Sequence, residues 1–183
     1  MRSIVVILPS NAAPRLFKPG GVFLNKTKVI TISGVVMAMY IGIMLATQGF
    51  AFGAYQIRIA TALYSLSYIF PFLVVPLALA NALANFMGPM GVLDFLGGFV
   101  VGIITSGAVY LVKRYNLPAF LVVPIVILAP ALIVPVWLSY ILDMPYFVLV
   151  VNLSIGQITP AIVGYLLIRV LTEPVKRMGL INE

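Results

Sequence analysis

The chain has 183 residues, of which 63% are hydrophobic and 8% are charged, and its formal net charge is +7. Soluble domains carry about 25% charged residues, so this composition excludes a soluble globular protein and indicates a membrane protein with several spans. The basic residues gather near the two ends of the chain and in one loop, a pattern typical of membrane topology and not of nucleic-acid binding. Cys and His are absent, which argues against disulfides, metal sites and cofactors.

The N-terminal segment, residues 1–28, is expected to be a cytoplasmic tail. Its apolar run, residues 4–8, is shorter than the ~7–15 residues of a signal-peptide core. A spanning helix needs ~20 apolar residues. Spans are predicted, in chain order, at 29–47, 59–70, 72–87, 92–112, 119–142 and 146–171, with a loop at 49–58, a turn at 88–91, and Glu173-Pro174 ending the last span.

The stretch 59–87 is ambiguous, because it is too long for one ordinary span and short for two. Pro71 and Pro76 lie in its middle, and proline breaks or kinks a helix. Two short helices meeting near Pro71 are favoured over one kinked helix, because only an even number of spans puts Lys113 and Arg114 on the same side as the basic tails. We therefore predict an all-α bundle of six transmembrane helices (29–172), with the tails 1–28 and 173–183 both cytoplasmic.

Only six charged residues lie between positions 31 and 172, and four of them fit at helix ends. Arg58 and Asp94 are harder to place there. An ionisable group in or near a membrane bundle is costly, so it indicates a functional site. Under the predicted topology both lie near the outer face, where the cost is modest and Arg58 would form the rim of a pocket.

Polar and aromatic side chains are predicted to gather around these two residues on the outer side. Asn81 and Asn85 are one helical turn apart and share a face. Amides and aromatic faces suit a flat, polar organic ligand. The expected substrate-binding residues are Gln56, Arg58, Tyr64, Asn81, Asn85, Asp94, Trp137, Asn152 and Gln157, and Ser65, Ser67 and Tyr68 are expected on the same side.

Two other interpretations of this polar set stay open. Tyr and Trp residues also form belts at membrane interfaces, and for the tyrosines this interpretation is favoured. For the amides of Asn81, Asn85 and Gln157, which lie deeper, ligand binding is favoured. Arg58 and Asp94 can form an internal ion pair and still bind a ligand.

The first span carries four small residues at intervals of four: Gly34, Ala38, Gly42 and Ala46. Such a stripe lets a second helix approach closely, which is how helices associate in membranes. Packing inside the bundle and contact with a partner subunit are equally favoured.

No catalytic residues are expected. The chain contains neither the G-x-x-x-x-G-K-[ST] loop of ATPases nor an H-E-x-x-H zinc motif. No Ser has a His or Lys base at a recognisable spacing, so an enzyme is disfavoured. No acidic residue lies clearly at mid-membrane, which also disfavours a proton or sodium relay.

Three segments carry a resemblance to a known family: Q-I-R-I-A-x-x-L at 56–63, A-N-x-x-G-x-x-G-x-x-D-x-x-x-G at 84–98 and I-G-Q at 155–157. Together with the small-residue first helix, they resemble the QueT family of queuosine-precursor transporters. These are substrate-binding S components of energy-coupling-factor (ECF) transporters. The resemblance covers roughly residues 31–171.

The resemblance implies a mechanism. An S component of the prokaryotic cell membrane captures a small vitamin-like molecule from outside and docks on a transmembrane coupling subunit with two cytoplasmic ATPases. It then reorients in the lipid bilayer to release the molecule inside. The small-residue stripe would meet the coupling subunit.

Two positions depart from the family pattern, which commonly has acidic residues where Thr61 and Gln157 stand. Their loss removes partners for a cationic aminomethyl group on a deazaguanine base. We therefore expect a neutral or differently substituted ligand, or a different vitamin-like compound.

An ion-coupled secondary transporter is the main alternative. It would need an acidic coupling site and often an internal inverted repeat, and neither is found in the sequence. A membrane scaffold that binds no small molecule ranks third, and a membrane enzyme ranks last.

Overall fold

The computed structural model describes residues 24–53, 55–178 and 180. Every regular element among these residues is a helix. The elements are α1 (Lys26–Ala46), α2 (Gln48–Ala51), η1 (Ile59–Tyr68), η2 (Pro71–Leu73), α3 (Val74–Phe86), α4 (Gly91–Arg114), η3 (Ala119–Leu121), α5 (Val122–Ile133), α6 (Pro135–Leu142) and α7 (Tyr146–Arg177).

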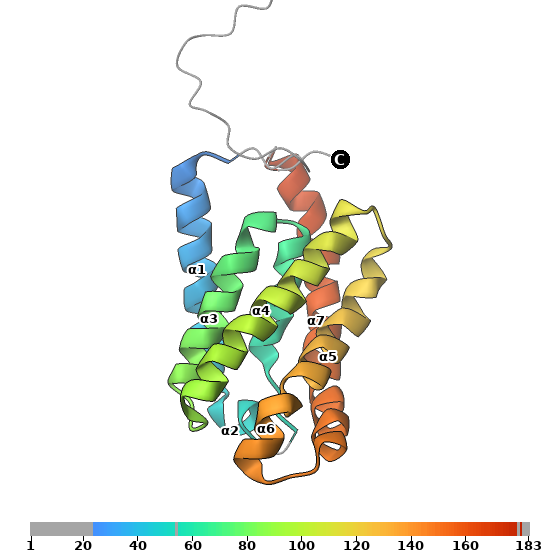
Figure 1. Ribbon diagram of the computed structural model, residues 1–183. Coiled ribbons are helices and arrows are strands. Elements are labelled where there is room, and N and C mark those ends of the chain that lie inside the picture. Colours follow the sequence, from blue (N-terminus) through green and yellow to red (C-terminus); the bar gives the residue numbers. More distant parts are fainter. Residues whose placement is uncertain (1–23, 54, 179, 181–183) are drawn as a thin grey trace, which may run out of the picture.

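The helices form one bundle in which successive segments alternate in direction (Figure 1). The alternating segments are α1, η1, α3, α4, α5 with α6, and α7. η1 is the central one, because it contacts α1, α3, α4, α5 and α7, and eight of its ten residues are buried. The buried hydroxyls of η1 therefore bond either the backbone of η1 itself, as Ser65 does with the Ala62 carbonyl, or a neighbouring helix, as Ser67 does with the Ser106 carbonyl on α4.

Three helices are long and apolar enough to cross a membrane: Lys26–Ala46, Gly91–Arg114 and Tyr146–Arg177. A fourth span exists if Ala119–Ile133 and Pro135–Leu142, which meet at 42°, count as one broken helix. The helix Pro71–Phe86 is apolar but shorter. The all-helical architecture is thus confirmed, while the six complete spans and the cytoplasmic termini stay predictions.

The break at Pro71 is confirmed, and the stretch 59–87 forms two helical segments. The first differs from the expected α-helix, because η1 is a 3₁₀-helix over ten residues. Such runs rarely exceed 3–4 residues, and they rise ~2.0 Å per residue against ~1.5 Å in an α-helix. η1 therefore extends further through the bundle than an α-helix of equal length.

Three predicted boundaries are wrong. Residues 48–51 form the short helix α2, where a loop was expected. Lys26 and Lys28 belong to α1 and not to a tail, and the rest of the predicted tail, residues 1–23, lies outside the described residues. Glu173-Pro174 does not stop the last helix, which continues to Arg177. Pro174 lies three residues before the end of α7 and removes only the one hydrogen bond that its own N–H would have donated.

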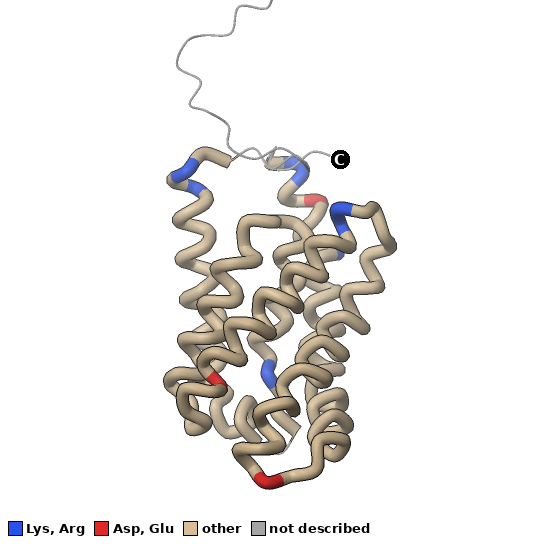
Figure 2. Tube along the Cα trace, in the orientation of Figure 1, with Lys and Arg blue, Asp and Glu red and all other residues tan. Residues whose placement is uncertain are grey.

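Charged residues divide the bundle into a basic end and an opposite end (Figure 2). The basic end contains the first turn of α1 and the last turns of α4 and α7, which carry Lys26, Lys28, Lys113, Arg114, Lys176 and Arg177. The opposite end contains α2, the α3–α4 turn and α6 (Figure 1). This distribution agrees with the charge pattern expected from the positive-inside rule.

Candidate functional site

Arg58 is buried near the opposite end of the bundle, at the start of η1. Its side chain is held on three sides. Nη1 donates a hydrogen bond to Oδ1 of Asn85 at 3.1 Å, and Nε donates to the carbonyl of Ala51 at 3.4 Å. The guanidinium also lies over the Phe52 ring, 5.1 Å from its centroid. Arg58 is only 5% exposed, so the predicted position at an exposed rim is wrong: its charge lies inside the bundle.

Asp94 lies opposite Arg58, in the first turn of α4, and is fully buried. Its Oδ1 accepts a hydrogen bond from Nε1 of Trp137 at 3.1 Å, and the positive end of the helix dipole favours its charge. Its Oδ2 lies 3.7 Å from Nη2 of Arg58, which is close enough for an ion pair but too far for a hydrogen bond.

The facing atoms of this ion pair, Arg58 Nη2 and Asp94 Oδ2, have no hydrogen-bond partner among the described residues. A buried polar atom without a partner costs ~1–3 kcal/mol, and more when it is charged. Native proteins leave few such atoms, and each one calls for an explanation. Thr105 Oγ1 is the only other such buried side-chain atom among the described residues, so the pair is the one place there where two charged atoms are left without hydrogen bonds.

Two asparagines on α3 fix this pair against α4. Nδ2 of Asn85 donates to the carbonyl of Asp94 at 3.0 Å, and Nδ2 of Asn81 donates to the carbonyl of Gly98 at 2.7 Å. A Cβ at position 98 would overlap the Asn85 amide, so Gly98 is what permits the close approach. The predicted shared face of Asn81 and Asn85 is confirmed, because both amides donate to backbone carbonyls of α4 that lie one turn apart.

A pair of tyrosines closes the site on its inner side. The Tyr40 hydroxyl lies 3.0 Å from Oδ1 of Asn81 and 3.3 Å from the Tyr64 hydroxyl. Both tyrosines are fully buried, so the favoured interpretation of Tyr64 as a membrane-belt residue is wrong. Tyr40 was not predicted as a site residue, although it lies four residues from Val36 and Met44 on the buried face of α1.

Gln157 on α7 forms the far wall. The Thr61 hydroxyl donates to its Oε1 at 2.7 Å, and its Nε2 donates to the carbonyl of Gln56 at 3.4 Å. Gln56 has a positive φ of 44°, which turns the chain sharply against α7. A Cβ at Gly156 would overlap the Tyr55 carbonyl oxygen, so only glycine allows this approach.

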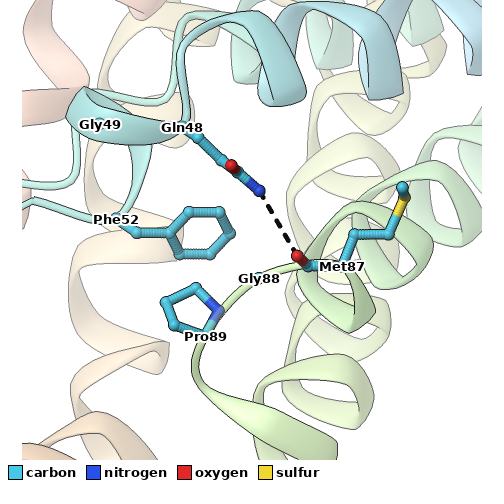
Figure 3. Close-up of a pocket in the computed structure, with 6 residues that line it drawn as sticks. All are labelled: Gln48, Gly49, Phe52, Met87, Gly88 and Pro89. Atoms are coloured by element: carbon cyan, nitrogen blue, oxygen red, sulfur yellow. Dashed lines mark hydrogen bonds between the residues drawn. The ribbon is translucent and has the colours of Figure 1, made fainter.

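A pocket of about 450 Å³ opens beside the site, between α2 and the α3–α4 turn (Figure 3). Ligand pockets typically measure ~300–1,000 Å³. Its lining residues are Gln48, Gly49, Phe52, Met87, Gly88 and Pro89. The Phe52 ring is shared, because it lines the pocket and also packs on the Arg58 guanidinium. Phe52 therefore separates the pocket from the buried ion pair, a role that no sequence pattern indicated.

The structure brings most of the predicted residues into two hydrogen-bonded groups. Arg58, Asn85, Asp94 and Trp137 are linked to one another, and Thr61 links Arg58 to Gln157 and so to Gln56. In the second group Tyr64 and Asn81 both bond Tyr40. The two groups together are called the cluster below. Asn152 on α7 is half-buried, and its side chain does not belong to the hydrogen-bonded groups described above. Tyr68 does not lie on the outer side as expected, because its ring lies 5.7 Å from Lys113 Nζ at the basic end.

The small residues of α1 face outward. Gly34, Ala38, Gly42 and Ala46 are all exposed, and a Cβ at Gly34 or Gly42 would meet nothing within 4 Å. The opposite face of α1, with Val36, Tyr40 and Met44, packs inside the bundle. Packing of the stripe against the bundle's own helices is therefore excluded among the described residues, and the stripe is free for another molecule.

Comparison with known proteins gives one match. The family model described as QueT transporter matches residues 30–173, which include every residue of the cluster. No curated protein and no solved structure matches the chain.

Proposed function

Because the chain belongs to the QueT transporter family, whose members are S components of ECF transporters, we propose that it is the substrate-binding subunit of an ATP-driven importer. In this role it captures a small vitamin-like or queuosine-precursor-like molecule from outside. It then delivers the molecule together with a coupling subunit and two ATPases. The nine predicted substrate-binding residues are assigned to this site, with Asn152 at its margin.

The observation that carries this proposal is the unsatisfied ion pair beside the pocket. Arg58 Nη2 and Asp94 Oδ2 are buried, face each other and lack hydrogen bonds among the described residues. An ion pair that served packing alone would gain most from full mutual hydrogen bonding. Here the surrounding amides and Trp137 satisfy the other atoms of both side chains and leave these two for a ligand.

The ligand reaches this pair through the pocket. Phe52 stands between them, directly after the short helix α2. When Phe52 moves aside, the pocket becomes continuous with Arg58 and Asp94, and a flat ligand replaces the phenyl ring over the guanidinium. Asn85 and Trp137 keep the two charged groups in place during the exchange.

The basic end of the bundle lies in the cytoplasm, so the pocket opens outside the prokaryotic cell membrane. The exposed stripe Gly34, Ala38, Gly42 and Ala46 is the surface for the coupling subunit. Its lack of side chains lets a partner helix approach the α1 backbone. The bundle itself supplies no ATPase motif, which is why it needs the other subunits.

The proposal is tested by purification and reconstitution. Mass spectrometry of the molecule released from the purified chain identifies the ligand, and proteoliposomes that contain the chain, a coupling subunit and two ATPases are then assayed for its uptake. Uptake that requires internal ATP and all subunits supports the proposal. Uptake by the chain alone that a protonophore abolishes would instead establish the ion-coupled secondary transporter.

A further inference from the structure

The basic end of the bundle carries two exposed arginines, Arg114 on α4 and Arg169 on α7. Neither has a carboxylate partner among the described residues. Nη1 of Arg114 donates a hydrogen bond to the Tyr110 hydroxyl at 2.9 Å. Nη1 of Arg169 donates in the same way to the Tyr165 hydroxyl at 3.1 Å. A guanidinium has five N–H donors, so most of the donors of each arginine remain for another molecule.

The two arginine–tyrosine pairs lie at the same height in the bundle. α4 and α7 both begin at the opposite end and run toward the basic end (Figure 1). Each tyrosine is the 20th residue of its helix, and each arginine is the 24th. Twenty helical residues rise ~30 Å, which is the thickness of the hydrocarbon core of a bilayer. A core that begins where the two helices begin would therefore end at the tyrosines and leave the arginines at the level of the lipid phosphates.

Both arginine side chains point back toward the apolar part of their helix. Helical side chains lean toward the N-terminus, which for α4 and α7 lies at the opposite end. The contact from each arginine to the tyrosine four residues earlier follows this direction and holds the guanidinium at that height. Arg177, the last residue of α7, lies ~12 Å beyond Arg169 along the helix axis, given the rise per residue. It has no such tyrosine, because Glu173 stands four residues before it.

The surroundings of the pairs suit a phospholipid. Exposed apolar side chains adjoin both pairs on the same helices: Leu111 on α4, and Ile162, Leu166 and Val170 on α7. These side chains offer apolar surface to acyl chains. Each tyrosine hydroxyl accepts a hydrogen bond from its arginine and keeps its own proton, so it can donate to a phosphate oxygen. Each pair therefore presents donors only, and a phosphate group presents acceptors only.

We propose that each arginine–tyrosine pair binds the phosphate of an anionic phospholipid in the leaflet at the basic end. This inference goes beyond the proposed function and does not depend on the transported molecule. The guanidinium fork contacts two phosphate oxygens, and the acyl chains lie along the exposed apolar side chains. Glu173 is the only acidic residue described at this end, so the end is strongly positive and favours a headgroup with a net negative charge.

Native mass spectrometry of the purified full chain tests this proposal, because it counts the lipids that stay bound and identifies them by mass. The probes are phosphatidylglycerol and phosphatidylcholine with the same acyl chains, added together in equal amounts. Phosphatidylglycerol is anionic, whereas phosphatidylcholine carries the same phosphate in a headgroup without net charge. We expect the wild-type chain to retain phosphatidylglycerol in preference, at two sites that are tighter than the rest.

Arg114→Gln and Arg169→Gln should each weaken phosphatidylglycerol binding at one of these sites by about fivefold, and the double variant should lose both sites. Tyr165→Phe keeps the ring and the charge of Arg169 but removes the hydroxyl, and should weaken the site on α7 by about threefold. It serves as a second variant if Arg169→Gln purifies poorly. Arg177→Gln is the matched control, because it removes the same charge from an exposed position of α7 without a tyrosine partner, and it should leave both sites unchanged.

The proposal is overturned if the wild-type chain retains the two lipids equally, or if Arg177→Gln weakens binding as much as Arg169→Gln does. Displacement of phosphatidylglycerol by excess inorganic phosphate would also overturn it, since it would reveal a site for a soluble anion. Arginine variants that keep both lipids but lose uptake in the reconstituted complex would assign these side chains to a contact with another subunit instead.

Discussion

At the residue scale, the site depends on how two opposite charges are kept in an apolar bundle. Desolvating an ion pair costs several kcal/mol per ion, and the pair recovers this only with good geometry and further hydrogen bonds. Arg58 donates such bonds to the Asn85 amide oxygen and the Ala51 carbonyl, and Asp94 accepts one from Trp137. Packing does not explain why Arg58 Nη2 and Asp94 Oδ2 stay 3.7 Å apart, too far for a hydrogen bond.

Replacing one member of the pair should be worse than replacing both. Arg58→Met leaves Asp94 buried and unpaired, and should destabilise the chain by ~3–5 kcal/mol. Arg58→Met combined with Asp94→Leu removes both charges, and should recover most of that stability while binding stays lost. Thermal unfolding of the purified variants measures the first effect, and the amount of copurifying ligand measures the second. A double variant that still binds ligand would show that the pair serves only stability.

Gly156 is predicted to be intolerant of even one methyl group. A Cβ there would overlap the Tyr55 carbonyl oxygen, so Gly156→Ala should push η1 and its preceding turn away from α7. Overpacking of this kind costs ~1–3 kcal/mol, and the shift would also break the Gln157 contact to Gln56. Gly34→Ala is the control, because an added Cβ meets nothing there. Thermal unfolding should show a clear loss for the first variant and none for the second, and equal behaviour would contradict the close approach.

At the element scale, η1 sets the position of the site. Its ten residues form a 3₁₀-helix enclosed by five other helices, and Arg58 stands at its N-cap. An α-helix of this length would be shorter by ~5 Å, given the rise of each helix type. The longer 3₁₀ form is therefore what carries Arg58 out to the level of Asn85 and Asp94.

The outward face of α1 should be needed for transport and not for binding. Gly42→Leu adds a large side chain to an exposed surface where an added Cβ meets nothing, so the fold should tolerate it. A partner helix would be held off the backbone, and uptake should fall by at least about tenfold. Ligand binding by the solitary chain should be unchanged. Ala38→Leu should behave alike.

The matched control for this stripe is Gly107→Leu. Gly107 lies on α4, where an added Cβ also meets nothing within 4 Å. This variant should retain uptake in the same reconstituted complex. Loss of ligand binding in Gly42→Leu, or equal loss of uptake in Gly107→Leu, would contradict a specific partner surface on α1.

The segment around α2 should control the rate of ligand exchange. Phe52→Ala removes the ring between the pocket and Arg58, so association and release should both accelerate, by roughly tenfold, with a smaller change in affinity. Stopped-flow fluorescence of Trp137 measures both rates. Phe50→Ala is the control, because Phe50 is also near the end of α2 but is 67% exposed and does not line the pocket. Unchanged rates in Phe52→Ala would place the entry route elsewhere.

At the scale of the whole molecule, hydropathy and proline positions were enough to predict the main helical segments, although not the short helix α2. The break at Pro71 and the turn at 88–91 follow from local backbone chemistry, and both are present. The 3₁₀ form of η1 was not predictable, because it depends on the five helices packed around it. The end of α7 was predicted wrongly because a local signal was given too much weight. Pro174 usually ends a helix, but α7 continues past it to Arg177.

The candidate site was likewise predictable from the sequence only in part. Polar residues in an apolar chain are few, so Arg58, Asn81, Asn85, Asp94 and Gln157 stood out by composition alone. The burial of these side chains could not be predicted, because it depends on how far η1 extends into the bundle. Tyr40 and Phe52 were not predicted as site residues. From sequence alone, an aromatic residue that only packs in a membrane helix or loop cannot be distinguished from one that belongs to a site. The pairing of Thr61 with Gln157 joins positions far apart in the chain, and only the fold reveals it.

The sidedness of the bundle can be tested directly, because the chain contains no cysteine and a single introduced thiol gives an unambiguous label. Asn116 follows α4 at the basic end, and Asp143 lies in the α6–α7 turn at the opposite end; both are exposed. In intact cells, a membrane-impermeant maleimide should label Asp143→Cys and should label Asn116→Cys only after the membrane is opened. This result follows if the positive-inside rule orients six alternating segments. Labelling of both cysteines from outside, or of Asn116→Cys alone, would overturn the orientation and place the pocket on the wrong side for import.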